Sequence, residues 1–271
     1  MTNLTSLSHA MAYEWTRIRT TRLAWYLAAV AVIATAVAAW AYSAIAMRVA
    51  GSTPVDPREA VTFVISRPSF APVVAGLLGV VAIGSDYRYG TMRTTLLVTP
   101  RRGIALGAKA LVASGVGAGL ALLNLLVAWA VAVKALDGRV TLSVGPLDVV
   151  QLVAAETALA AGWALFGLFV AVLVRTQLIA VGLILTVPFI FEGMVRSMGL
   201  LTGQGWLQHI GGYLPFTAGT AMTDLSNRAG GVLLASNGDR AGPLLGTVIF
   251  VSTIAMLGLL GQSHFRRQDV L

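Results

Sequence analysis

Long apolar runs, separated by short polar segments, constrain this chain more than any other feature. Of its 271 residues, 57% are hydrophobic and only 11% are charged, and the mean hydropathy is +0.81. A soluble domain carries about a quarter charged residues, so this chain has too few polar side chains to cover a water-facing surface. The sequence therefore predicts an all-α integral membrane protein.

Six apolar segments are long enough, or can be extended enough, to cross a hydrocarbon core of about 30 Å. The predicted spans are residues 23–47, 60–84, 104–133, 149–174, 178–201 and 243–261. In the second span only residues 70–83 are cleanly apolar, and extension through 60–65 requires Arg67 to face protein or to snorkel. In the fifth, the apolar part ends near Pro188. We expect a broken or re-entrant helix there, completed by residues 192–201.

The distribution of Lys and Arg predicts that both termini are cytoplasmic. In this orientation the short inner segments carry most of the basic residues: Arg17, Arg19, Arg22, Arg88, Arg93, Arg101, Arg102, Lys109, Arg175, Arg266 and Arg267. The net charge of +8 then matches the negative surface of the inner leaflet, and it is not a nucleic-acid signal. The whole chain, 1–271, forms one transmembrane domain in this interpretation.

Residues 4–20 are predicted to form an amphipathic helix lying in the plane of the membrane interface. Apolar residues recur there at spacings of three and four, which places them on one face: Leu4, Leu7, Met11, Trp15 and Ile18. Glu14, Arg17 and Arg19 lie off that face. The alternative is a frayed basic tail.

A short basic block, residues 86–103, separates the second and third spans. Asp86, Tyr87 and Arg88 lead into Gly90 and Thr91, and the pattern of residues 91–98, which include Arg93, suits a short amphipathic helix. Pro100 stops that helix, because it lacks the next backbone donor, and the basic residues Arg101, Arg102 and Lys109 follow. A compact helix held at the membrane in this way suits transmission of force from a soluble partner. The alternative is an ordinary cytoplasmic loop.

Motifs for covalent chemistry are missing from the sequence. There is no Cys, no Gly-Lys pair of a phosphate-binding loop and no GxSxG nucleophile motif. His9, His209 and His264 lie in separate segments, so no metal site is expected. We therefore predict that the chain is not an enzyme and binds no cofactor or metal itself.

A few polar residues fall inside apolar runs, where they are costly unless paired. Glu156 lies about two turns into the fourth span, and it either lines a substrate or proton path or pairs structurally. Glu192 sits at the end of the fifth span and Asn124 deep in the third, where an interhelical hydrogen bond is the expected role. Small residues four apart, at Gly115 and Gly119 for example, fit helix packing within one subunit or in a dimer.

The block resembles that of permease subunits of the ABC-2 class of ABC transporters. The residues that carry the resemblance are Asp86-Tyr87-Arg88, Gly90-Thr91, Thr94-Thr95-Leu96-Leu97, Pro100-Arg101-Arg102 and Lys109, with Tyr213-Leu214-Pro215 before the last span. Asp86 stands where that family more often has Glu, which leaves its ion-pair partner open.

The resemblance implies a bacterial inner-membrane exporter. Two copies of the chain, or one copy and a similar permease, would bind two separate ATPase subunits that hydrolyse ATP. The coupling residues would be Asp86, Tyr87, Arg88, Gly90, Thr91, Arg93, Pro100, Arg101 and Arg102, with residues 4–20 as a connecting helix. The second and fifth spans would line the path, with Val73, Val74, Leu77, Leu183, Val187 and Phe189, and also Glu156. Those apolar side chains suit a hydrophobic or amphipathic cargo such as a drug, a peptide antibiotic or a lipid-like compound.

Two other functions remain open on sequence. One is an ion-coupled secondary transporter that uses Glu156 as its proton carrier. The other is a membrane anchor or sensor subunit without transport of its own. The first would work as a purified chain without an ATPase, and the second would tolerate polar substitutions along the second and fifth spans.

Overall fold

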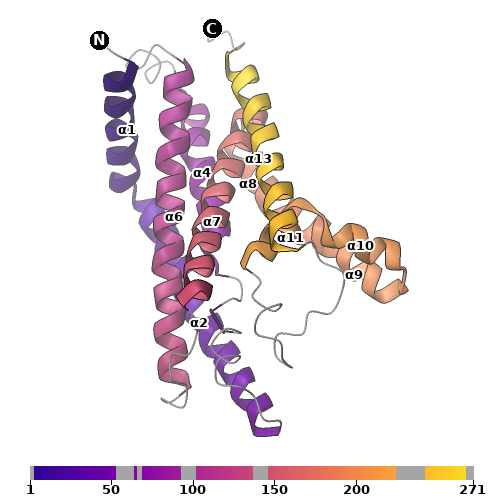
Figure 1. The fold of residues 1–271 in the computed structure, drawn as a ribbon. Helices are drawn as coiled ribbons and strands as arrows, with labels where there is room; N and C mark the ends of the chain where they lie inside the picture. The colour runs from indigo at the N-terminus through magenta and orange to yellow at the C-terminus, as the bar shows by residue number, and fades with distance from the viewer. Residues whose placement is uncertain are drawn as a thin grey trace.

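The computed structural model describes residues 3–52, 64–65, 69–92, 102–136, 146–223 and 242–266, and every regular element in these ranges is a helix (Figure 1). The elements are α1 (Asn3–Thr20), α2 (Arg22–Ser52), α4 (Ala71–Arg88), α6 (Arg102–Ala135), α7 (Pro146–Val174), α8 (Gln177–Leu185), the π-helix η1 (Thr186–Phe191), α9 (Glu192–Thr202), α10 (Gly205–Gly212), α11 (Pro215–Thr220), the 3₁₀-helix η2 (Ala221–Thr223) and α13 (Pro243–Arg266). The predicted all-α class is confirmed for this part of the chain.

Five helical stretches are long and apolar enough to cross a membrane: Arg22–Arg48, Arg102–Ala135, Leu147–Val174, Gln177–Gly199 and Pro243–Phe265. They coincide with five of the six predicted spans. The other, 60–84, overlaps α4, which has 18 residues and carries Asp86 and Arg88 near its end. Residues 60–63 and 66–68, which would extend it, lie outside the described residues. The count of six therefore stays a prediction.

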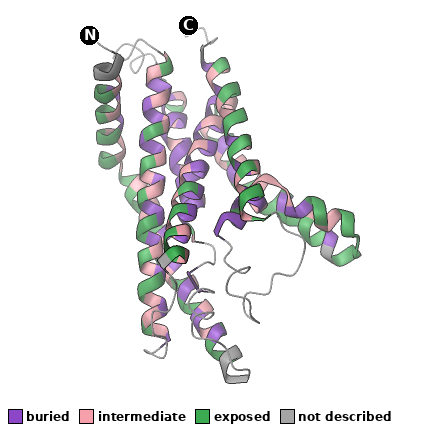
Figure 2. Ribbon diagram, in the orientation of Figure 1, coloured by how far each residue is buried: buried purple, intermediate pink, exposed green. Residues whose placement is uncertain are grey.

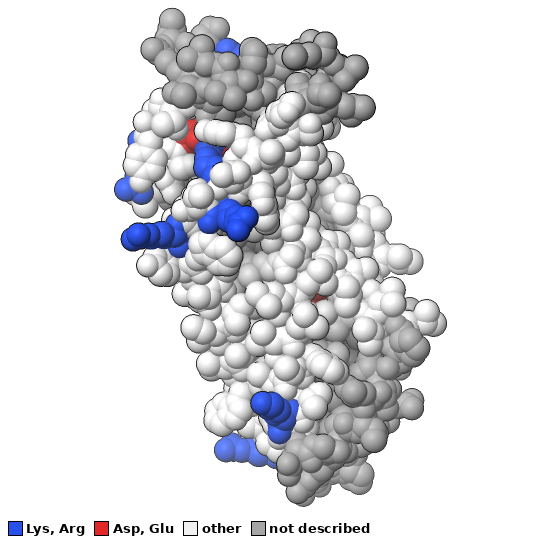
Figure 3. Space-filling model, turned by 90° about the vertical axis from the view of Figure 1, so that its left-hand side faces the viewer, with Lys and Arg blue, Asp and Glu red and all other residues white. Residues whose placement is uncertain are grey.

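Apolar side chains face outward along α2, as they do in a helix that contacts lipid. A stripe at spacings of three and four is more than half exposed: Tyr26, Val30, Ile33, Val37 and Trp40. Figure 2 shows buried residues gathered on the inner helices and exposed residues on the outer ones. In Figure 3, Lys and Arg lie at two levels, and the described surface between them shows none in this view. This protein is a multi-pass membrane protein.

The centre of the bundle is the packing of α4 against α7, where the two backbones touch. A Cβ atom at Gly79 would lie 2.0 Å from the carbonyl oxygen of Ala164, and one at Gly167 would lie 2.0 Å from that of Gly76. Neither position accepts a side chain without separating the helices. The glycine pairs noted from sequence play no such part on α6, because Gly115 and Gly119 face open space. Around this contact α6, α8 and α13 complete the core.

The first helix differs from its predicted orientation. Figure 1 shows α1 running side by side with the amino-terminal part of α6, along the bundle and not across it. At 34 residues α6 is about 51 Å long, which exceeds a hydrocarbon core of about 30 Å, so one end has room for such a partner. The packed face is centred on Ala10 and Glu14, which are buried. Of the predicted apolar stripe, Leu7, Met11 and Ile18 are half-buried beside this face, whereas Trp15 is 52% exposed.

The fifth predicted span contains a π-helix and no break. Pro188 lies within η1, which joins α8 to α9 without interruption. A π-helix absorbs the missing backbone donor of a proline by shifting the hydrogen-bond register. In Figure 1 the chain leaves the bundle after η1, and α9 and α10 pack against each other as a hairpin that extends away from the lower end of α13.

Candidate functional site

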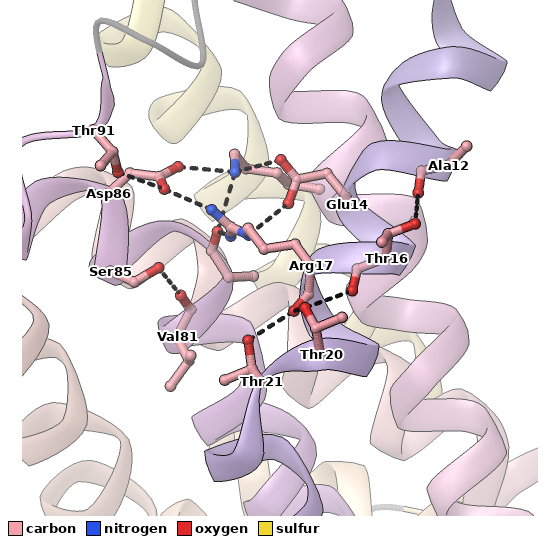
Figure 4. A network of polar contacts seen from close by, with 12 residues as sticks. Ala12, Glu14, Thr16, Arg17, Thr20, Thr21, Val81, Ser85, Asp86 and Thr91 are labelled. Carbon is pink, nitrogen blue, oxygen red and sulfur yellow. Dashed lines mark hydrogen bonds and ion pairs between the residues drawn. The ribbon is translucent and has the colours of Figure 1, made fainter.

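Four charged side chains from three helices meet in one cluster, the charge cluster (Figure 4). Glu14 and Arg17 come from α1, Asp86 from the end of α4 and Lys109 from the second turn of α6. Arg17 Nη1 lies 2.6 Å from Asp86 Oδ1, and Arg17 Nε lies 3.2 Å from Glu14 Oε2. Lys109 Nζ lies 2.6 Å from Glu14 Oε1 and 2.9 Å from Asp86 Oδ2. Each carboxylate therefore contacts both cations.

The cluster is shielded from solvent. The side chains of Lys109, Asp86 and Glu14 are 1%, 3% and 4% exposed, and that of Arg17 is 23% exposed. Burying a single charge costs several kcal/mol, and only close opposite charges and hydrogen bonds compensate for it. Two cations and two anions make the group neutral as a whole. The ion pairs among these four side chains therefore join α1, α4 and α6 at one point.

The main chain of α4 adds a further acceptor. Both Arg17 Nη2 and Lys109 Nζ donate to the carbonyl oxygen of Ala82, the latter at 3.2 Å. Ala82 lies one turn before Asp86, near the carboxyl end of α4, where the helix dipole favours positive charge. The cations therefore bind the end of α4 through its backbone as well as through its carboxylate.

The turn after α4 folds back onto Asp86. Gly90 has φ +67°, a left-handed conformation that favours glycine. It allows Thr91 to donate its backbone N–H to the carbonyl oxygen of Asp86 at 3.0 Å and its hydroxyl to Asp86 Oδ1 at 3.3 Å. The Gly-Thr pair of the predicted block thus helps to hold the carboxylate in place.

The predicted coupling residues divide into a buried and an exposed group. Asp86 is buried, and Tyr87 packs partly buried against the core. Arg88 is exposed and lies 5.4 Å from the centre of the exposed Tyr89 ring, a cation–π contact. Arg102 is the first residue of α6. The others, Arg93, Pro100 and Arg101, lie outside the described residues.

Sequence reasoning missed the α1 members of the charge cluster. Glu14 and Arg17 were placed off the apolar stripe and so toward solvent, but their spacing of three puts them on the face that packs against α4 and α6. The signal that could have revealed them is the scarcity of acidic residues, of which the chain has 11. An acidic residue three before an arginine in such a chain marks a candidate for burial with partners.

The predicted path residues lie mostly within the packed core. Val74 is buried, and Val73, Leu77, Leu183 and Val187 pack against the same core cluster. Phe189 is exposed on one side and contacts the ring of Trp163, with centres 6.2 Å apart. The structure therefore brings the apolar residues of α4, α8 and η1 together, but as contacts within one chain.

Glu156 occupies a separate place in the bundle. It is buried on α7 and accepts a hydrogen bond from Ser69 Oγ at 3.1 Å. Beside it is a cavity of about 10 Å³, which is room for about one water molecule. Its lining includes Thr35 and Tyr42 of α2 but none of the predicted apolar path residues. Glu156 therefore does not share this cavity with those residues.

Glu192 and Asn124, the two other polar residues noted in the apolar runs, both make local hydrogen bonds. Glu192 accepts hydrogen bonds from the backbone N–H groups of Phe216 at 3.0 Å and Thr217 at 2.7 Å, which caps the short helix α11. Asn124 is buried, and its amide donates to the carbonyl oxygen of Leu120 in its own helix at 2.8 Å. Glu192 therefore joins α9 to α11, whereas the expected interhelical bond of Asn124 is not found within the described residues.

Comparison of the chain with known protein families and with characterised proteins gave no match.

Proposed function

We propose that this chain is the permease subunit of an ABC-2 type exporter, driven by a separate ATPase. The observation that carries the proposal is the contact between Asp86, the first residue of the predicted block, and Lys109, six residues beyond its end, which meet at 2.9 Å. Both also bind α1, Asp86 through Arg17 and Lys109 through Glu14. A force applied to the segment that connects Met92 to Arg102 would move α4, α6 and α1 together. This is the property that a coupling segment requires.

The arrangement of the ends supports a cytoplasmic location for that loop. Figure 1 shows both chain termini at one end of the molecule, the end where α4 finishes and α6 begins. An even number of crossings, six if α4 is counted, is what such an arrangement needs. With the termini inside a bacterial plasma membrane, the loop would face the compartment that holds the ATPase and ATP.

The outward face of α8 and η1 supports pairing with a second permease. Large apolar side chains on this stretch are exposed: Leu178, Ile179, Leu185, Phe189, Ile190 and Phe191. A second copy facing this stretch would enclose an apolar path between subunits, since the core of one chain is filled. A hydrophobic or amphipathic cargo fits such a path.

The buried Glu156 is the specific observation that favours a second candidate, an ion-coupled secondary transporter. A carboxyl group in the bundle, hydrogen-bonded to Ser69 and next to a water-sized cavity, has the setting of a proton carrier.

Transport in inverted membrane vesicles separates the two candidates. A lipophilic fluorescent dye is offered to vesicles containing the chain, with and without co-expressed ABC ATPase subunits. We expect dye uptake only with the ATPase and ATP, and equal uptake in the Glu156→Gln variant. Uptake by the chain alone, driven by a pH gradient and lost in Glu156→Gln, would contradict the ABC-2 proposal.

A further inference from the structure

We propose that an anionic phospholipid binds in a groove between α1, α2 and α6, with its phosphate on Arg19 and one acyl chain over Gly115 and Gly119. The groove has a volume of about 360 Å³ and is lined almost entirely by apolar atoms. Its lining includes Trp15 and Arg19 of α1, Trp25 of α2, and both glycines of α6. This site goes beyond the proposed function and needs no ATPase.

The floor of the groove is open because α6 carries glycines at positions 115 and 119. Nothing lies within 4 Å of the position where a Cβ would stand on Gly115 or Gly119, and both residues are exposed. Leu78 and Leu120 close the groove from behind, and both are buried. An open, apolar trough on a lipid-facing surface fits a hydrocarbon chain.

The depth of the groove matches one leaflet. Gly119 lies ten residues along α6 from Lys109 of the charge cluster, a rise of about 15 Å. Half of a hydrocarbon core is also about 15 Å. A chain that starts beside the charged end of the bundle and runs to Gly119 would therefore span the leaflet on the side of the termini.

The rim of the groove supplies both charge and anchoring. Trp15 and Trp25 are 52% and 63% exposed, as expected of rings at headgroup depth. Trp25 Nε1 donates to the carbonyl oxygen of Arg19 at 2.8 Å, which fixes the ring beside that residue. Arg19 is exposed and has no ion-pair partner within the described ranges, whereas Arg17, two residues earlier and so on the opposite side of the helix, belongs to the charge cluster. A phosphate is the complementary group for such a rim.

This charge complementarity favours a lipid over another occupant. A helix of a second copy could also approach two exposed glycines, but it would leave Arg19 without an anion. A neutral lipid would fill the trough equally well and would make no use of Arg19. The occupant that uses both parts of the site is a phospholipid with a net negative headgroup, such as phosphatidylglycerol.

Fluorescence quenching by lipids with brominated acyl chains tests the site. The full chain, carrying Trp40→Phe, Trp129→Phe and Trp206→Phe so that Trp15 and Trp25 dominate the lipid-exposed signal, is reconstituted in phosphatidylcholine vesicles. Brominated phosphatidylglycerol should quench at a mole fraction roughly fivefold lower than brominated phosphatidylcholine, since one arginine near anionic lipid contributes about 1 kcal/mol. Arg19→Gln should abolish this preference. Arg48→Gln, which removes an exposed arginine at the other end of the same span, should keep it.

A second pair of variants tests the part of the groove that would hold the acyl chain. Gly115→Leu with Gly119→Leu should remove the quenching that saturates at low mole fraction, and the protein should still fold because the new side chains meet open space. Gly107→Leu, which also meets open space on α6 but lies outside the groove, should leave the quenching unchanged. Equal quenching by the two lipids, selectivity that survives Arg19→Gln, or quenching unaffected by the leucines would overturn the proposal. The proposal would also be overturned if chemical cross-linking detected a dimer of the unmodified chain that was lost in the leucine variant. That result would assign this face to a second copy.

Discussion

Arg17 and Asp86 are 69 residues apart in the sequence, and their charged groups lie 2.6 Å apart in the fold. The contact joins the first helix to the end of α4, which is the start of the predicted block. Through Lys109 it continues to α6. The charge cluster is therefore the point at which the amino-terminal helix, the central helix and the longest helix are held in register.

Removing Lys109 should destabilise the protein strongly. The Lys109→Met variant leaves Glu14 and Asp86 buried with Arg17 as their shared cation, and an uncompensated buried charge costs about 3–5 kcal/mol. Lys134→Met serves as the control, because Lys134 is exposed at the other end of the same helix. Thermal unfolding in detergent measures both. Equal midpoints for the two variants would show that the cluster contributes nothing to stability.

The Arg17–Asp86 pair should show strong coupling in a double-mutant cycle. Each single change, Arg17→Gln or Asp86→Asn, unbalances the cluster, but the double variant keeps the neutral pair of Glu14 and Lys109 at 2.6 Å. We expect the double variant to be more stable than the sum of the singles predicts, by about 1–3 kcal/mol. Arg17→Gln combined with Arg48→Gln should be additive. An additive result for the pair itself would argue against a shared network.

Adding a methyl group at the contact between α4 and α7 should disrupt the core. Gly79→Ala and Gly167→Ala each place a Cβ against a backbone carbonyl, and overpacking of this kind costs about 1–3 kcal/mol or more. Gly193→Ala on α9 meets open space and is the matched control. The yield of folded protein and its unfolding temperature are the measurements. Wild-type values for Gly79→Ala would show that the backbones do not touch as described.

Reversing two charges within the block should detach the ATPase while leaving the fold intact. Arg101→Glu with Arg102→Glu is expected to abolish co-purification of ABC ATPase subunits and ATP-driven dye uptake, with an unchanged unfolding temperature. Arg48→Glu with Lys134→Glu reverses two charges at the opposite ends of their helices and should leave both readouts intact. The coupling role is wrong if the block variant still co-purifies with the ATPase and transports.

The apolar runs predicted the all-α class and six spans, and five of these coincide with helices long and apolar enough to cross a bilayer, because the length and composition of a run can be read from the sequence. Asp86 and Lys109 were also identified as parts of one block. Their partners on α1 were not, since Lys109 and Glu14 are 95 residues apart and periodicity shows which residues share a face but not what that face meets. The apolar stripe of α1 was predicted to lie in the membrane interface. A neutral set of opposite charges can be buried just as well, which pattern alone does not reveal.

Glycine spacing was an equally incomplete guide. The glycines four apart on α6 were predicted to allow close packing of helices. A Cβ atom at Gly115 or Gly119 would nevertheless have no other atom within 4 Å. The true backbone contact uses Gly79 and Gly167, on two helices whose pairing no local pattern specifies. At Pro188 the sequence indicated an irregularity correctly. Its form, a π-helix, depends on how α8 and α9 are held by the rest of the chain.

The π-helix of Thr186–Phe191 also acts as a rotational spacer. Such a segment amounts to one extra residue within an α-helix, and one residue corresponds to about 100° of turn. Deleting a single residue there would let the stretch wind as an ordinary α-helix and would swing Glu192 by that angle, away from the amides of Phe216 and Thr217. The direction in which the α9–α10 hairpin leaves the bundle therefore depends on the π-helical winding of six residues. For that direction, the number of residues in this segment matters more than the identity of their side chains.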